Sequence, residues 1–131
     1  MKQKLNFSPK VLIVDDDTDL RESIAELLSN YGCKVFEAQD GVEAIEQFKK
    51  TSPDFTLMDI CMPKMDGISA VEKICTERNP NAKIVFMSGI NEQQKIASYN
   101  FKCVVEYMNK PIRSSELLDL FNRYAVLKIN F

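Results

Sequence analysis

The amino-acid sequence predicts an α/β fold: a doubly wound, five-stranded parallel sheet with five helices packed on its two faces. Short apolar runs of about four to six residues alternate with helical patterns along the whole chain. Such alternation is typical of right-handed strand–helix–strand units. With 131 residues, 45% of them hydrophobic, the chain has the size and balance of one domain with a real core. We therefore expect a single domain over residues 1–131.

The N-terminal part of the chain predicts two strand–helix units. The runs VLIV at 11–14 and KVFEA at 34–38 predict the strands. The first helix is predicted from apolar side chains on one helical face, Leu20, Ile24, Leu27, Leu28 and Tyr31, with Gly32 as its stop signal. The second helix has Asp40 as its expected N-cap and apolar side chains at helical spacing, Val42, Ile45 and Phe48.

The C-terminal part repeats this pattern three times. The runs FTLM at 55–58, KIVFMS at 83–88 and CVVEYM at 103–108 predict strands. The helix after the first of them would bury Ile68, Val71, Ile74 and Cys75. A weaker helix is expected over 91–100, and the last helix carries Leu117, Leu118, Phe121 and Tyr124 on one face.

The polarity of the five runs predicts their order in the sheet. The runs at 11–14, 55–58 and 83–88 have almost nothing polar in their interiors, whereas 34–38 and 103–108 each carry charge. A parallel strand covered on both faces is continuously apolar, so the three apolar runs belong in the middle and the two mixed runs at the edges. The strand order 2-1-3-4-5 satisfies this, and it puts the ligand crevice at the carboxyl ends of the first and third strands.

Composition excludes several classes of function. The net charge is −2 and no block of Lys and Arg occurs, so direct nucleic-acid binding is not expected. No apolar run is long enough to span a bilayer and no signal-peptide core is evident, which predicts a cytoplasmic protein without membrane insertion. Histidine is absent, and with it the usual general base. The four cysteines form no CxxC pair, so we expect small buried side chains in a reducing compartment.

Three carboxylates follow the two strands that flank the predicted crevice. Asp15 and Asp16 come directly after the run 11–14, and Asp59 follows the run 55–58. Because the carboxyl ends of parallel strands meet at one edge, these side chains should converge there. Crowded carboxylates repel one another and recruit a cation, and a site with only oxygen ligands favours a hard ion such as Mg²⁺.

A hydroxyl and an ammonium group are expected at the same edge. Ser88 ends the run 83–88, and Lys110, which precedes Pro111, follows the run 103–108. A divalent cation, an ammonium and a hydroxyl around a carboxylate would suit a phosphoryl group with charge on its three oxygens. Asp59 would then be the nucleophile, held rigidly for in-line attack by a strand that is buried on both faces.

Four motifs, in order, carry a family resemblance: VLIVDDD, LMDICMPKMDG, VFMSG and YMNKPI. Together they resemble the receiver domain of two-component response regulators, a flavodoxin-like fold, over about residues 9–127. The resemblance implies that Asp59 accepts a phosphoryl group from the phosphohistidine of a kinase or phosphotransfer protein. It also implies that Asp16, Asp59 and the backbone carbonyl of Cys61 ligate Mg²⁺ while Asp15 assists. Lys110 would contact the phosphoryl oxygens, and the Lys110–Pro111 peptide would be cis.

The resemblance further implies a conformational switch. The hydroxyl of Ser88 would move to the phosphoryl group, and Tyr107 would turn inward, changing the surface of the fourth helix, fifth strand and fifth helix for a downstream protein target. The protein would then be a signalling phosphoacceptor rather than an enzyme. The charge pattern of a dimer built on the fourth and fifth helices is not evident, so a monomer or weak dimer is expected.

Two alternatives remain open from sequence. The segment VLIVDDDTD also resembles haloacid dehalogenase-type phosphatases, in which Asp15 would be the nucleophile and Asp17 the acid/base, again with Mg²⁺. Those enzymes usually have Thr or Val where this chain has Asp19. The second alternative is a receiver fold that signals by binding without phosphotransfer, although neither the acidic residues nor the lysine is missing here.

Overall fold

The computed structural model describes residues 7–62, 64–75, 82–89 and 102–129, and it contains the predicted sheet. All pairings are parallel, in the order β2-β1-β3-β4-β5. The strands are β1 (Lys10–Val14), β2 (Lys34–Ala38), β3 (Phe55–Asp59), β4 (Ile84–Ser88) and β5 (Val104–Asn109). The strand order predicted from polarity is therefore confirmed: every residue of β3 and β4 is buried, whereas the edge strands β2 and β5 are partly exposed.

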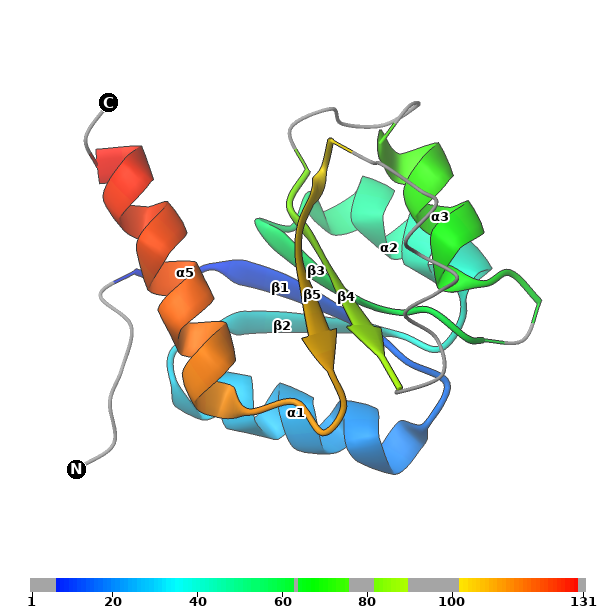
Figure 1. The fold of residues 1–131 in the computed structure, drawn as a ribbon, viewed down its shortest axis with the longest axis horizontal. Coiled ribbons are helices and arrows are strands. Elements are labelled where there is room, and N and C mark those ends of the chain that lie inside the picture. The colour runs from blue at the N-terminus through cyan, green and yellow to red at the C-terminus, as the bar shows by residue number, and fades with distance from the viewer. Residues whose placement is uncertain (1–6, 63, 76–81, 90–101, 130–131) are drawn as a thin grey trace.

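Four described helices cover the two faces of the sheet (Figure 1): α1 (Thr18–Asn30), α2 (Gly41–Thr51), α3 (Gly67–Lys73) and α5 (Ser114–Ile129). The helix expected over 91–100 lies outside the described residues. Three aspartates begin three of these helices. Asp17, Asp40 and Asp66 each accept a hydrogen bond from the backbone N–H three residues later, which satisfies a free donor of the first turn. The predicted N-cap at Asp40 is confirmed.

Alternating side chains of the sheet build two apolar clusters. Side chains from α1 and α5 pack on one face, among them Ile24, Leu28, Leu117 and Phe121. Side chains from α2 and α3 pack on the other, among them Ala44, Phe48, Ala70 and Val71. Because both faces are covered, every residue of the central strands except Lys10 is buried, including those at their carboxyl ends. No described helix is long and apolar enough to cross a membrane.

One irregularity interrupts the pairing of β4 with β5. Ile84 pairs with Val104, but the next residue of β4, Val85, pairs with Glu106, so β5 contains one extra residue, Val105. Such a β-bulge bends the strand and resets which side chains share a face. Beyond it, Phe86 pairs with Tyr107 and Ser88 with Asn109.

Two expectations about side chains are wrong. Val42 is 44% exposed, because Gly41, Ala44 and Phe48 form the buried face of α2 instead. The cysteines are not four isolated buried side chains. Cys33 is buried and Cys61 exposed, while Cys75 and Cys103 lie with their sulfur atoms within bonding distance.

Candidate functional site

The carboxyl ends of β1 and β3 bring three carboxylates together, as predicted. The two strands are neighbours, with Val14 paired to Met58. Asp15 and Asp59 are almost completely buried, whereas Asp16 is exposed. One carboxylate oxygen from each of the three lies within 4.8 Å of the others. Two buried acids beside an exposed one form a site that is fixed by the sheet and open to solvent on one side.

Lys110 brings a positive charge to the two buried carboxylates. Its Nζ lies 3.1 Å from Asp59 Oδ1 and 3.2 Å from Asp15 Oδ2. Its backbone N–H donates to the carbonyl of Ser88 at 2.8 Å, and its peptide bond to Pro111 is cis, as the family resemblance implies. Burial alone would lower the pKa of Lys110, but the charges of Asp59 and Asp15 outweigh burial and raise it. The lysine therefore stays protonated, yet one ammonium cannot neutralise three carboxylates.

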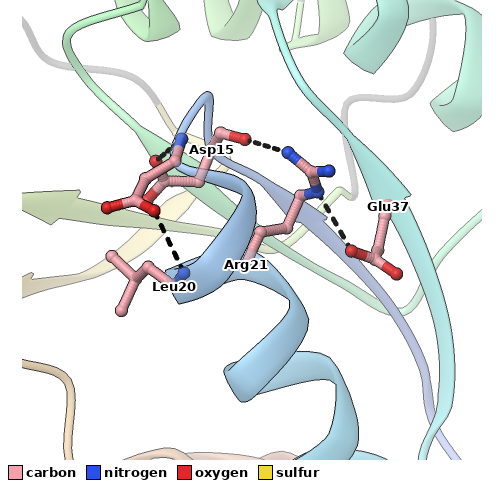
Figure 2. A network of polar contacts seen from close by, with 5 residues as sticks. Asp15, Leu20, Arg21 and Glu37 are labelled. Carbon is pink, nitrogen blue, oxygen red and sulfur yellow. Dashed lines mark hydrogen bonds and ion pairs between the residues drawn. The ribbon is translucent and has the colours of Figure 1, made fainter.

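Asp15 is held at its backbone as well as at its side chain (Figure 2). Its carboxylate Oδ1 accepts from the N–H of Asp17 at 2.9 Å. Its carbonyl oxygen accepts from Arg21 Nη1 at 2.7 Å, and Arg21 Nε donates to Glu37 Oε1 at 3.0 Å. The guanidinium therefore joins the end of β1 to the edge strand β2. Sequence reasoning missed Arg21, because its only signal is a position six residues after Asp15 on the helix that the acidic run begins.

The loop after β3 is held by two glycines. The Cα of Gly67 lies against the carbonyl oxygen of Asp59, where a Cβ would overlap it, and its N–H donates to the carbonyl of Ile60 at 2.9 Å. A Cβ at Gly41 would lie 2.6 Å from the carbonyl oxygen of Met65, to which the Gly41 N–H donates at 3.1 Å. Both positions therefore require glycine for close backbone approach. The two contacts fix the loop in which Cys61 is the second residue after Asp59.

Ser88 and Tyr107 lie where their strands predict. Ser88 ends β4 beyond Met87, the residue that pairs with Asp59, and is 1% exposed. Tyr107 is 44% exposed, and its ring stacks on Phe86 with 5.9 Å between ring centroids. A shallow hollow of about 490 Å³ begins at Tyr107 and continues along Lys110 and Pro111 to Glu116 on α5. The serine thus belongs to the acidic rim, whereas the tyrosine faces outward.

The donor set can be compared with what a metal ion requires. The three clustered side chains offer only carboxylate oxygens, and such hard ligands favour Mg²⁺ over softer ions. Two of the acids are buried, so a cation would compensate charges that solvent screens poorly. The residues therefore fit a Mg²⁺ ion.

Comparison with known proteins decides the family. The family model described as the response regulator receiver domain matches residues 11–122. The chain belongs to this receiver family. Chemotaxis protein CheY from Treponema pallidum is 38% identical over 121 residues, which cover 89% of this chain and 83% of that protein. Sporulation initiation phosphotransferase F from Bacillus subtilis is 29% identical, over 95% of this chain and 99% of that protein.

A solved structure agrees. The receiver domain of the Francisella response regulator 1452 superimposes with a TM-score of 0.76 at 29% identity, covering 88% of this chain and 94% of that one. Receiver domains are phosphoacceptors of two-component signalling that interact with histidine kinases or phosphotransfer proteins and bind Mg²⁺ through an aspartate cluster. The chain is therefore a receiver domain of this signalling class, and its acidic group is of the kind that the family uses.

Proposed function

We propose that Asp59 is the phosphoacceptor of this receiver domain and that Mg²⁺ is required for the transfer. The observation that carries the proposal is the position of its carboxylate. It ends a central strand, is 3% exposed, and lies 3.1 Å from the ammonium of Lys110. A nucleophile held by a buried strand keeps its orientation for in-line attack. The fixed cation beside it would stabilise charge on the transferring oxygens.

The phosphoryl donor would be the phosphohistidine of a kinase or phosphotransfer protein. A carboxylate oxygen of Asp59 forms a bond to phosphorus while the phosphorus–nitrogen bond breaks, and the released imidazole takes up a proton. Asp16, Asp59 and the backbone carbonyl of Cys61 would hold Mg²⁺, with Asp15 assisting. When bound, the ion would neutralise developing charge on the phosphoryl oxygens. Arg21 would act through Asp15, by fixing its carbonyl.

Phosphorylation would be read out by the other strands of the same rim. Ser88 directly follows Met87, the residue that pairs with Asp59, and its hydroxyl would reach a phosphoryl group on Asp59 from there. Movement of Ser88 would open space for the ring of Tyr107, which now lies outside on Phe86. The hollow along β5 and α5 would change shape, and a downstream protein target would bind there. We expect this to occur in the cytoplasm, with the protein as a monomer or weak dimer.

The phosphatase alternative would move the nucleophile to Asp15. The match to the receiver family over residues 11–122 favours Asp59 instead. A module that only binds its target stays the second candidate, because the same surface could work without phosphate.

The test is intact-mass spectrometry after incubation with acetyl phosphate and Mg²⁺. We expect one phosphoryl adduct on the wild type, none on Asp59→Asn, and none when EDTA removes the metal. Asp19→Asn is the matched control, because it removes an exposed carboxylate of α1 outside the cluster. An adduct that survives Asp59→Asn and disappears in Asp15→Asn would establish the phosphatase nucleophile. No adduct on the wild type would favour the binding module.

A further inference from the structure

Two cysteines that are 28 residues apart in the sequence lie side by side. The Cα atoms of Cys75 and Cys103 are 5.9 Å apart, and their sulfur atoms are within bonding distance. Disulfides form at Cα separations of about 4.4–6.8 Å, so the backbone already allows a bond without rearrangement. Spacing in the sequence could not predict this pair, because Cys75 follows α3 and Cys103 precedes β5, and spacing does not determine how these two elements pack.

The pair belongs to the apolar cluster under α2 and α3, and Cys75 is the less buried of the two. Cys75 follows the C-cap of α3, Ile74, and is half-buried. Cys103 directly precedes β5 and is 2% exposed, and its carbonyl accepts from the N–H of Ile84 at 2.7 Å. The pair therefore lies at the amino ends of β4 and β5, away from the carboxyl ends that carry Asp59. An oxidant would react first with Cys75, and the more deeply buried Cys103 would then react with the oxidised Cys75.

The other two cysteines have different environments. Cys33 packs in the apolar cluster on the opposite face of the sheet, and burial raises the pKa of its thiol to about 11. A thiol that rarely ionises is a poor nucleophile. Cys61 is exposed on the loop after β3. The four thiols should therefore respond differently to an oxidant. Cys75 and Cys103 would react as a pair, Cys33 would be inert, and Cys61 would be accessible.

We propose that Cys75 and Cys103 form a reversible disulfide and are a redox modification site, with a hydroperoxide as the oxidant. The thiolate of Cys75 attacks one oxygen of hydrogen peroxide, the oxygen–oxygen bond breaks, and the leaving hydroxide takes up a proton to form water. The sulfur of Cys103 then displaces the hydroxyl of the sulfenic acid as a second water, and the sulfur–sulfur bond forms. Two thiols lose two hydrogens, and one peroxide is reduced to two waters.

The bond would join the two ends of the segment that carries β4. Ser88 ends that strand, and β5 (Val104–Asn109) begins directly after Cys103, contains Tyr107 and ends directly before Lys110. Oxidation would fix the amino end of β5 to α3, while reduction would release it. In reducing compartments, disulfides of this kind are usually transient and redox-sensing. The proposal does not depend on which aspartate is phosphorylated.

The test starts from fully reduced protein that is treated with hydrogen peroxide, unfolded and alkylated. We expect two of the four cysteines to escape alkylation, a mass lower by two hydrogens, a peptide that links residues 75 and 103, and recovery of all four thiols with dithiothreitol. Cys61→Ser is the matched control and should behave in the same way apart from its missing thiol. Neither Cys75→Ser nor Cys103→Ser should give the linked peptide.

Two outcomes would overturn the proposal: four alkylated cysteines after peroxide, or oxidation confined to dimers through Cys61. The variant Cys103→Ser changes a buried site, so its fold is checked by circular dichroism. Cys75→Ser changes a half-buried position and carries the test alone if Cys103→Ser does not fold. The oxidised wild type is also expected to unfold at a higher temperature than the reduced form, because the bond restricts the unfolded chain.

Discussion

The Cα of Gly67 lies against the main-chain carbonyl oxygen of Asp59, so closely that no side chain fits between the two residues. The glycine begins α3, and the aspartate ends β3. The N–H of Gly67 also donates to the carbonyl of Ile60, the residue after Asp59. The first turn of α3 therefore packs against the main chain of the proposed phosphoacceptor, and this contact sets the direction in which the chain leaves β3.

Substituting Gly67 with alanine is expected to damage both stability and phosphorylation. The added methyl group must push the Asp59 carbonyl or α3 aside, which costs about 1–3 kcal/mol of the free energy of unfolding. A displaced nucleophile should also slow phosphorylation by about tenfold to a hundredfold. Urea unfolding and the rate of adduct formation measure the two effects. Ser69→Ala, an exposed change on the same helix, should leave both unchanged, and wild-type behaviour of Gly67→Ala would refute the steric role.

Lys110 should stabilise the fold at neutral pH and lose this effect only in alkali. Its pKa is raised above 10.5 because Asp59 and Asp15 outweigh burial. The folded state thus binds the proton more tightly than the unfolded state, so the stabilisation is complete below the ordinary pKa and is lost as pH rises through the higher folded value. We expect the difference in unfolding free energy between wild type and Lys110→Met to be constant from about pH 7 to 10 and to shrink above about pH 10.5.

Urea unfolding across this pH range, without metal, provides the measurement for Lys110. Lys102→Met removes an exposed lysine near the start of β5 and should show no such decrease. A difference for Lys110→Met that already shrinks near pH 8 would mean that the two carboxylates do not hold the ammonium as the structure has it.

Arg21→Ala should lower the free energy of unfolding more than removal of an ordinary surface arginine does. The side chain of Arg21 is 12% exposed and donates to the partly buried carbonyl of Asp15. Loss of a charged donor from such a carbonyl costs about 1–3 kcal/mol. Arg123→Ala is the control, because Arg123 is 60% exposed at 3.8 Å from its partner, Glu106, and should cost less than about 1 kcal/mol. The free energy of unfolding of both variants is measured with urea, and an equal decrease in the two would argue against a specific role for Arg21.

Asp16 should contribute to metal binding although it is exposed. It belongs to the carboxylate cluster, whereas Asp19, exposed on α1, does not. Both asparagine variants remove one negative charge, so a difference between them reports ligation rather than net charge. We expect Asp16→Asn to weaken Mg²⁺ binding by at least the roughly 10–100-fold that is typical for loss of a residue that only supports a metal ligand, and Asp19→Asn to change the affinity little. Calorimetric titration with Mg²⁺ measures both, and equal affinities would exclude Asp16 as a ligand.

The sequence predicted the sheet and the convergence of carboxylates because both depend on local patterns. Strands covered on both faces are continuously apolar, which separated β1, β3 and β4 from the edge strands. Parallel strands end at one edge, so residues that follow them had to meet there. Asp40 was predictable as a cap for the same reason, since the signal lies within a few residues of the helix that it begins.

The features that sequence reasoning missed depend on contacts between distant segments. Nothing near Gly67 or Gly41 in the sequence indicates that a carbonyl oxygen approaches each of them. The hydrogen bond from Arg21 to the carbonyl of Asp15 depends on how α1 packs beside β2. Cysteine spacing does not determine which sulfurs meet, so Cys75 and Cys103 were expected to be separate.

The extra residue in β5 determines which way the tyrosine faces. If Val105 instead paired with Val85, so that the pairing that starts at Ile84 and Val104 continued in step, Tyr107 would lie beside Met87, in the cluster under α1 and α5. Glu106 would then replace the tyrosine beside Phe86. With the bulge, Tyr107 shares a face with Phe86, the position from which the proposed inward turn of its ring would start. The same register sets where Lys110 meets the carbonyl of Ser88, so that one irregular pairing in an edge strand places both the ring of Tyr107 and the ammonium of the acidic rim.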